Sequence, residues 1–275
     1  MLKRLFATLV FLAVPARALA AEKPLWVAGV GAGFLSVPDY PGSDQQRGYI
    51  LPLPYFVYRG KFITAGRNGI QGRLFASKRV HFSLSLSASP PVNSTDNPAR
   101  RGMPDLRPMV ELGPEIDVQL WRSASRRMRL DLRLPVRAAI TIEAPPRQIG
   151  WLFTPVLNLD IANVIGQRGW TMGIQAGPLF TDRGYNQTFY GVAPVYATVT
   201  RRTYTAHGGY AGAKLTLALS KRFQRYWIGT FVRYDALTGA VFANSPLVLR
   251  SHNISFGVGV VWIFGQSSQM VASDE

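Results

Sequence analysis

The 275-residue chain contains no cysteine. This absence excludes disulfide bonds, zinc–thiolate centres, thiol redox chemistry and the lipidated cysteine that anchors a lipoprotein. Histidine is also scarce, with three occurrences at His81, His207 and His252. No group of His, Asp and Glu residues has the sequence spacing of metal ligands. The sequence therefore predicts neither a metal nor another cofactor.

Acidic residues are few, because 15 Asp and Glu stand against 31 Lys and Arg, for a net charge of +16. Such an excess can indicate a partner made of nucleic acid. The N-terminus argues against that partner, because Lys3 and Arg4 precede a short apolar run and a small-residue cleavage site at 18–20. That run is too short to span a bilayer. We expect a signal peptide over 1–20, and lipid headgroups, lipopolysaccharide or an acidic wall polymer as the counter-charges.

Long apolar runs are missing from the rest of the chain, although 47% of all residues are hydrophobic. Apolar residues instead recur at every second position, as where Val110, Leu112 and Ile116 alternate with Glu111 and Glu115. This period predicts β-strands with one apolar face. A soluble β-sandwich alternates as well, so alternation alone does not decide between the two classes.

Three further features favour a membrane barrel. The clearest alternating segments run over about nine to eleven residues, which is the length that a tilted strand needs to cross the bilayer. The opposite faces are mostly polar or glycine, as a barrel lumen is. Tryptophans lie near the predicted strand ends, where the aromatic girdles of such barrels occur. The six are Trp26, Trp121, Trp151, Trp170, Trp227 and Trp262.

Short turns and longer Pro/Gly/Asn-rich loops alternate between the predicted strands. Twelve strands with both termini in the periplasm place the short turns inside and the long loops outside, as this class requires. We therefore predict an all-β fold, a transmembrane antiparallel β-barrel of about twelve strands in the outer membrane of a Gram-negative cell. The barrel occupies 21–264, followed by a C-terminal tail over 265–275. The predicted strands are 24–35, 49–58, 61–66, 70–76, 80–88, 108–122, 127–141, 149–162, 169–180, 207–220, 225–237 and 252–264.

The sixth and seventh predicted strands form a hairpin with charged residues on its inner face. In one possible register Glu115 lies opposite Arg133, but Asp117 then faces a second aspartate. In the other, centred on Ser125, Asp117 lies opposite Arg133 and like charges do not meet. We favour the second register. Glu115, Asp117 and Arg133 are thus candidate ion-pairing residues of the lumen, with a structural role in a narrow barrel favoured over an ion-selecting constriction.

Basic residues gather at the short turns, with no acidic residue among them. One interpretation is contact with anionic lipid headgroups of the inner leaflet. The other is a docking surface for acidic periplasmic partners or for the wall. We call this set the basic rim: Arg59, Lys61, Lys78, Arg79, Arg126, Arg127, Arg168, Lys221, Arg222 and Arg225.

Catalysis has little support in the sequence. His81 and Ser83 share a strand face, as a membrane lipase or deacylase could use. However, Ser85 and Ser87 continue the same polar row, so a lumen lining explains the pair equally well. We predict that the protein is not an enzyme.

Several motifs occur in a characteristic order along the chain. They are Asp39-Tyr40-Pro41-Gly42-Ser43, Pro52, Pro54, Tyr58-Arg59-Gly60, Leu112-Gly113-Pro114, Phe189-Tyr190-Gly191-Val192 and Ser245-Pro246-Leu247-Val248. In this order and spacing they resemble the MipA/OmpV family of outer-membrane proteins, over essentially the whole mature chain. In one departure from barrels of this class, which usually end on an aromatic residue, eleven residues follow Phe264. The assembly signal is therefore internal, or the tail is a disordered extension.

The resemblance implies a non-enzymatic barrel without catalytic residues. The family's namesake is described as a scaffold that joins a membrane-bound lytic transglycosylase to a bifunctional penicillin-binding protein during wall growth, so these are the implied partners beside membrane lipid and lipopolysaccharide. Other members are immunogenic or osmotically regulated surface proteins. We expect a scaffold for peptidoglycan-remodelling enzymes. The alternatives are a small-solute channel or transporter and a surface adhesin or immunogen.

Overall fold

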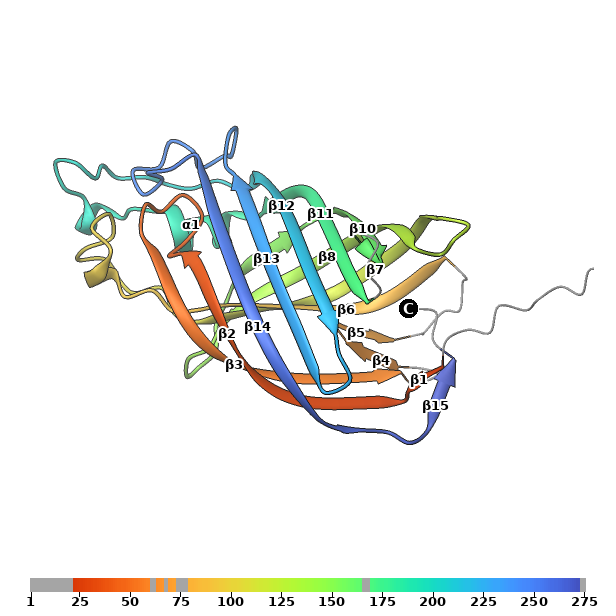
Figure 1. Cartoon of the computed structure of the whole chain (residues 1–275). Coiled ribbons are helices and arrows are strands. Elements are labelled where there is room, and N and C mark those ends of the chain that lie inside the picture. Colours follow the sequence, from red (N-terminus) through yellow and green to blue (C-terminus); the bar gives the residue numbers. More distant parts are fainter. Residues whose placement is uncertain (1–21, 60–62, 67–68, 73–78, 165–168, 273–275) are drawn as a thin grey trace, which may run out of the picture.

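The computed structural model describes residues 22–59, 63–66, 69–72, 79–164 and 169–272 (Figure 1). The predicted signal peptide over 1–20 lies outside these residues. Thirteen strands of the described part form one antiparallel sheet that curls into a barrel wall. They are β2 (Trp26–Pro38), β3 (Gln46–Arg59), β4 (Ile63–Gly66), β5 (Gly69–Gly72), β6 (Val80–Ser89), β7 (Met109–Arg122), β8 (Met128–Thr141), β9 (Gln148–Phe153), β10 (Val156–Ala162), β11 (Trp170–Thr181), β12 (Gly209–Arg222), β13 (Tyr226–Ala236) and β14 (His252–Gln266).

β9 and β10 occupy a single position in the wall, because each pairs with both β8 and β11. The sequence predicted one strand over 149–162, whereas the structure interrupts it at Thr154 and Pro155. Proline has no N–H to donate to a ladder, so strands commonly break where it falls inside a sheet. With β9 and β10 counted as one position, the described part of the wall has the twelve positions that the sequence predicted.

Strand pairing runs around the wall in sequence order, and β14 pairs with β2 to join the last strand to the first. The pairing is extensive between β2 and β3, from Trp26 opposite Tyr58 to Pro38 opposite Gln46. It is thin at β4 and β5, which are four residues each, and β3 meets β4 through Tyr58 and Arg59 within the described residues. These are the two strands with the weakest alternation in the sequence.

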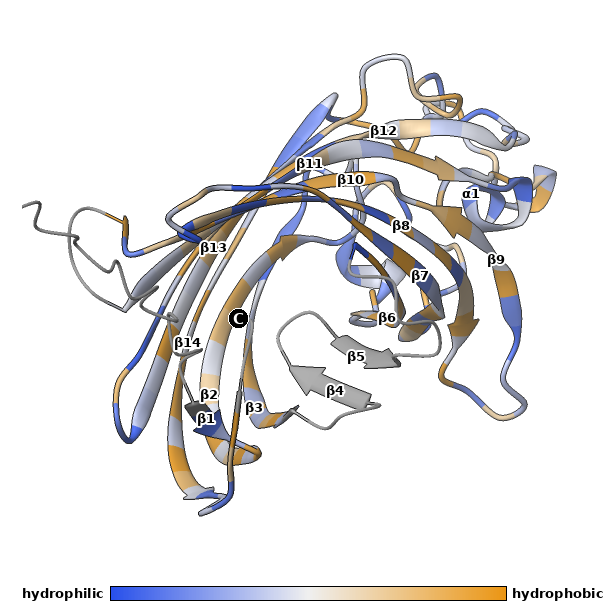
Figure 2. Ribbon diagram, turned by 90° about the vertical axis from the view of Figure 1, so that its right-hand side faces the viewer, coloured by the Kyte–Doolittle hydropathy of each residue, from blue (hydrophilic) through white to orange (hydrophobic). Residues whose placement is uncertain are grey.

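The two faces of the wall differ in polarity, as the alternation predicted. On β14 the residues from Ile254 to Phe264 at even positions are exposed, whereas the odd positions are buried toward the lumen. Large apolar side chains cover the outer surface elsewhere too, including Ile50 at 82% exposure and Leu86 at 65%. Figure 2 shows apolar and polar residues alternating along β8 and β9. Among the described residues, no helix has the length and apolarity needed to cross a membrane.

The tryptophans lie close to strand ends, as expected. Trp26 begins β2, and Trp121, Trp151 and Trp262 are half exposed on the outer face near the ends of their strands. Trp227 differs, because it borders a cavity inside the lumen. Trp227 lies two residues before Gly229 and four before Phe231, so it faces the lumen as they do on β13. The sequence pattern alone did not distinguish it from a girdle residue.

The two ends of the described chain meet at the short-turn end of the barrel. After β14, the chain forms β15 (Met270–Ala272), which pairs antiparallel with β1 (Glu22–Pro24). Leu25 N–H also donates to the carbonyl of Gln269 at 2.8 Å. Residues 270–272 are therefore ordered as a strand. Phe264 lies inside β14, two residues before its end.

Candidate functional site

The long loops at the end opposite the termini pack into a core of their own, which we call the loop cap (Figure 1). It packs on the inward-facing ends of the strands, such as Met109 of β7 and Leu179 of β11. Helix α1 (Arg183–Tyr190) belongs to it. Four loops contribute its buried side chains: Tyr40 from the first, Val92 and Leu106 from the second, Phe189, Tyr190 and Val192 from the largest, and Ala240, Phe242 and Leu247 from the last.

Hydrogen bonds between distant loops fix the loop cap. Tyr40 Oη donates to the carbonyl of Leu247 at 2.9 Å, and Tyr190 Oη donates to the carbonyl of Pro41 at 3.0 Å. The Tyr190 ring stacks on Phe242 with 3.7 Å between centroids and 10° between planes. Three of the motifs that carried the family resemblance thus meet in one cluster. The sequence showed each motif but not their convergence.

Arg100 is the more deeply buried of two arginines in the loop cap, with 2% of its surface exposed against 9% for Arg201. Its guanidinium donates to the carbonyls of Phe189 and Pro104 at 3.0 and 3.2 Å, and to Ser94 Oγ at 3.3 Å. It also lies 5.8 Å from the centre of the Tyr40 ring. Burial lowers the pKa of Arg100, and burial raises the pKa of Tyr40 to about 12. The hydrogen bonds of Arg100 thereby join the segments around Ser94, Pro104 and Phe189.

A layer of polar side chains lies directly beneath the loop cap, deeper in the lumen. Arg137 Nη1 pairs with Glu111 Oε2 at 3.0 Å, and Tyr185 of α1 donates to the other oxygen of Glu111 at 3.2 Å. Asp235 pairs with Arg233 at 3.0 Å and stands opposite Lys214 in the β12–β13 register. Because Tyr185 belongs to the largest loop, this layer ties the loop cap to the wall.

The charged hairpin takes the register centred on Ser125, with Asp117 opposite Arg133 and a bulge between Gln119 and Trp121. Arg133 Nε lies 3.6 Å from Asp117 Oδ1, and Ser83 donates to Asp117 Oδ2 at 2.9 Å. Glu115 instead stands opposite Pro135 and is buried. Both Asp117 and Arg133 are about nine-tenths buried at their side chains. The geometry is compatible with either a stabilising pair or a charged constriction.

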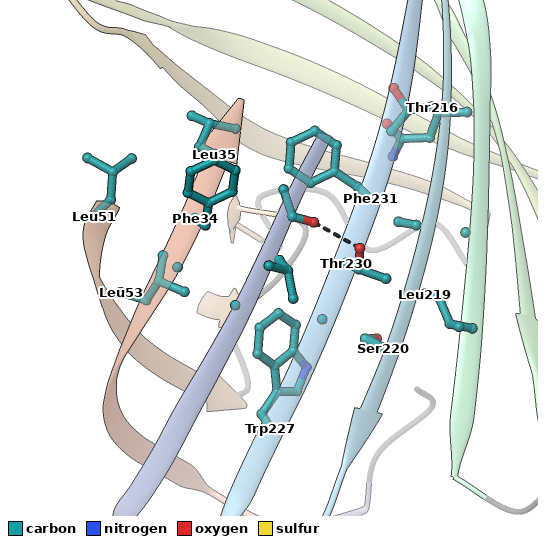
Figure 3. A pocket seen from close by; sticks show the side chains of 18 of the residues that line it. Phe34, Leu35, Leu51, Leu53, Thr216, Leu219, Ser220, Trp227, Thr230 and Phe231 are labelled. Carbon is teal, nitrogen blue, oxygen red and sulfur yellow. Dashed lines mark hydrogen bonds between the residues drawn. The ribbon is translucent and has the colours of Figure 1, made fainter. Parts of the chain in front are cut away.

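A cavity of about 430 Å³ lies in the lumen on the short-turn side of the polar layer. Figure 3 shows Leu35, Leu53, Trp227 and Phe231 around it. These side chains come from β2, β3 and β13 and form an apolar wall. Arg133, Asn158, Asp160, Gln175 and Thr216 form a facing polar wall. Asn158 is held there by Gln175 Nε2, which donates to its Oδ1 at 3.0 Å.

The described residues of the basic rim lie at the short-turn end, opposite the loop cap. Arg79, Arg126, Arg127 and Arg225 are exposed. Lys221 Nζ stands 5.4 Å above the Trp170 ring, and Arg222 donates to Gln266 at 3.4 Å. Lys61, Lys78 and Arg168 lie outside the described residues, and only the backbone of Arg59 is described.

The His, Asp and Glu residues of the described part of the chain do not form a metal site, and His81 stands opposite Asp117 in the β6–β7 register, on the same strand face as Ser83. No group of three or more His, Asp and Glu residues lies close enough there to hold a metal ion. Ser83 of β6 donates to Asp117 on the neighbouring strand β7. His252 contacts Ser251 Oγ at 3.3 Å on the exposed surface.

An outward apolar belt, an inward polar face and a wall of twelve strand positions define the class as an outer-membrane β-barrel protein. The model of the family described as MltA-interacting protein MipA matches residues 30–264, so the chain belongs to this family. It is 24% identical to outer membrane protein OmpV of Vibrio cholerae serotype O1 over 246 residues, covering 87% of this chain and 86% of that protein. It is 25% identical to outer membrane protein Omp26La of Vibrio anguillarum with the same coverage.

Solved barrels are more distant. Outer membrane phospholipase A from Escherichia coli is 13% identical with a TM-score of 0.30, covering 90% of this chain and 92% of that one. OprG from Pseudomonas aeruginosa is 8% identical with a TM-score of 0.24, covering 89% and 94%. These likenesses are too slight to inform on function.

Proposed function

We propose that the protein is a non-enzymatic interaction protein of the outer membrane, whose basic rim docks acidic surfaces of peptidoglycan-remodelling enzymes in the periplasm. The family description names an interaction with MltA, and a lytic transglycosylase and a penicillin-binding protein are the partners that the family resemblance implies. The residues of the basic rim would form the docking site, because the barrel presents them on short hairpins next to the membrane.

The observation that supports this proposal is the one-sided charge of the described short turns. Arg126 and Arg127 are exposed on the β7–β8 turn, and Arg225 is exposed on the β12–β13 turn. No acidic residue occurs between Arg122 and Met128 or between Lys221 and Tyr226. A patch of one sign attracts a partner of the other sign and accelerates its association. Short hairpins hold these charges at fixed positions, which favours a defined docking geometry.

The test reverses three of these charges in one variant, Arg126→Glu, Arg127→Glu and Arg225→Glu. Its matched control carries Arg101→Glu, Arg183→Glu and Arg250→Glu, three exposed arginines of the loop-cap end. Pull-down from detergent extracts then measures recovery of the lytic transglycosylase and the penicillin-binding protein. We expect recovery to fall at least about tenfold with the rim variant, because like charges at a docking surface repel and tenfold requires only about 1.4 kcal/mol. Equal recovery with both variants would show that the rim contacts lipid only.

Surface binding through the outer loops is a second candidate, favoured by apolar residues at the tip of the largest loop. Val195 is 80% exposed and Val199 is fully exposed, beside Pro194 in a short 3-10 turn (Pro194–Tyr196). Exposed apolar residues that cluster on a surface commonly mark a binding site. Val195→Ser with Val199→Ser should reduce adhesion of cells that display the protein, without affecting its assembly. Unchanged adhesion would exclude this tip as the contact.

A further inference from the structure

The lumen is divided into three layers along the barrel axis. On β12 the inward positions run from Ala211 in the loop cap through Lys214 in the polar layer to Thr216 beside the cavity. The neighbouring strand β13 passes through the same layers in the opposite order, from Phe231 beside the cavity to Asp235 in the polar layer. The cavity is therefore separated from the long-loop end by two packed layers. Since outer-membrane barrels keep their short turns in the periplasm, it lies on the periplasmic side.

Glycines beneath the apolar wall keep the cavity from being filled. A Cβ on Gly257 would lie 2.6 Å from the ring of Phe231, and one on Gly33 would lie 2.9 Å from the Leu53 side chain. Gly229 lies in the same way beneath Trp227. Because these residues have no side chain, Leu53, Trp227 and Phe231 lie flat against the wall. Narrow barrels commonly fill their interior with side chains, whereas here the wall is set back around an open volume.

The two walls of the cavity suit an amphipathic ligand. Trp227 and Phe231 offer aromatic faces, which favour a flat aromatic body. On the opposite side, the Thr216 hydroxyl and the Gln175 amide offer hydrogen-bonding groups. Arg133 and Asp160 on this wall have partners of opposite charge, Asp117 and Arg129, each at 3.6 Å. The charges are thus balanced, which favours a neutral polar group over an ionised one. A volume of about 430 Å³ falls in the range of small-molecule sites.

We infer that the periplasmic half of the lumen is a binding site for a small amphiphile with an aromatic body and one neutral hydrogen-bonding group. The aromatic body lies between Leu53, Trp227 and Phe231, and the polar group faces Thr216 and Gln175. The loop cap and the polar layer make this a pocket with one accessible end. This site is independent of the basic rim, so its failure leaves the proposed docking function intact.

The probe is 1-naphthol, which has an aromatic body and a single hydroxyl, and it is titrated into the full mature protein in lipid nanodiscs. Isothermal calorimetry against empty nanodiscs subtracts partition into lipid. We expect saturable binding of one molecule per barrel. Ala218→Phe places a ring inside the cavity and should weaken binding at least about tenfold, corresponding to about 1.4 kcal/mol. Ala176→Phe is the matched control, because Ala176 is exposed on the outer face of β11 and faces lipid.

Heat-modifiable migration in gels checks that both variants form barrels. If Ala218→Phe does not fold, Thr216→Val serves instead, because it keeps the shape of the side chain and removes its hydroxyl. It should reduce the preference for 1-naphthol over naphthalene about fivefold, the effect of one hydrogen bond. Absence of saturable binding beyond empty nanodiscs, or equal affinity of the Ala218→Phe and Ala176→Phe proteins, overturns the site. An unchanged preference in Thr216→Val overturns the assignment of its polar wall.

Discussion

Tyr40 and Leu247 are 207 positions apart in the chain, and the hydroxyl of the first donates a 2.9 Å hydrogen bond to the carbonyl of the second. Both side chains are almost completely buried in the loop cap. The bond joins the first long loop to the last one, across the β14–β2 junction where the wall closes in sequence. The hydrogen bond therefore holds together the loop that follows the first strand of the wall and the loop that precedes its last strand.

Tyr40→Phe tests this bond, because it leaves the Leu247 carbonyl buried without its donor. An unsatisfied buried acceptor costs about 1–3 kcal/mol, so the loop cap should open more readily and limited proteolysis of the long loops should accelerate. Tyr204→Phe is the matched control, since Tyr204 Oη donates to the carbonyl of Val241 at 3.3 Å in an exposed setting. Similar cleavage rates for the two variants would contradict a special role for Tyr40.

Alkaline pH should act on the same residue. Burial raises the pKa of Tyr40 to about 12, whereas the ordinary value is 10. The fold thus favours the neutral phenol, and this contribution to stability is complete below pH 10 and is lost as the pH rises toward 12. Ultraviolet titration of tyrosinate in the native barrel, with Tyr40→Phe subtracted, should place this group well above the exposed tyrosines. Ionisation of Tyr40 near pH 10 would show that the loop cap does not bury it.

Arg100→Met should release the loop cap more strongly. Methionine replaces the apolar stem of the arginine but leaves the carbonyl of Phe189 without the donor that Arg100 supplies, whereas the Pro104 carbonyl keeps Ser94 Oγ at 2.8 Å. Losing hydrogen bonds to a charged group costs about 3 kcal/mol. Planar-bilayer recordings should then show conductance events that the unmodified barrel lacks. Arg101→Met is the control, because Arg101 is exposed beside it. Identical recordings from the two variants would mean that Arg100 does not hold the mouth shut.

Gly31→Val should prevent assembly of the wall. A Cβ on Gly31 would overlap the backbone carbonyl of Val260 on the neighbouring strand, which cannot move aside without breaking the β14–β2 ladder. Such backbone overlap belongs to the rare substitutions that cost about 4 kcal/mol or more. Ala32→Val changes the adjacent, outward-facing residue and should be tolerated. The measurement is the fraction of protein with heat-modifiable gel mobility, and normal assembly of Gly31→Val would refute the close approach.

The wall was predictable from the sequence because the side-chain period of a strand is two. One buried and one lipid-facing surface impose that period on every long strand, so β14 and β7 appeared with nearly their observed bounds. Charge repulsion also selected the hairpin register, since the alternative would have set Asp117 against another aspartate. β4 and β5 were indistinct because four residues hold too few alternations to establish a period.

The loop cap and the cavity were not predictable in the same way. Tyr40, Tyr190 and Phe242 meet through contacts between loops, and irregular backbone carries no periodicity that would reveal which face is buried. Their motifs were visible in the sequence, but a motif does not state its distant partner. Trp227 was likewise assigned to the girdle, because it lies near a strand end. The alternation along β13 places its side chain on the lumen face instead. Both failures concern long-range packing that local patterns do not encode.

The Asp117–Arg133 pair separates the two interpretations of the charged hairpin. At 3.6 Å it is longer than the 2.7 Å pair between Arg147 and Glu143 in an outer loop, so distance alone ranks it as weaker. Burial reverses that order, because Arg147 is 67% exposed whereas Arg133 is 11% exposed, and solvent screens the loop pair.

A double-mutant cycle with Asp117→Asn and Arg133→Gln should therefore give a coupling of about 1–2 kcal/mol in barrel unfolding. The same cycle at Glu143 and Arg147 should give a clearly smaller coupling, because solvent screens exposed pairs. Arg133→Glu adds the decisive comparison, because repulsion from Asp117 should destabilise the barrel without creating a stable conductance. Altered ion selectivity with unchanged stability would instead identify the pair as a constriction, and the structural interpretation would then be wrong.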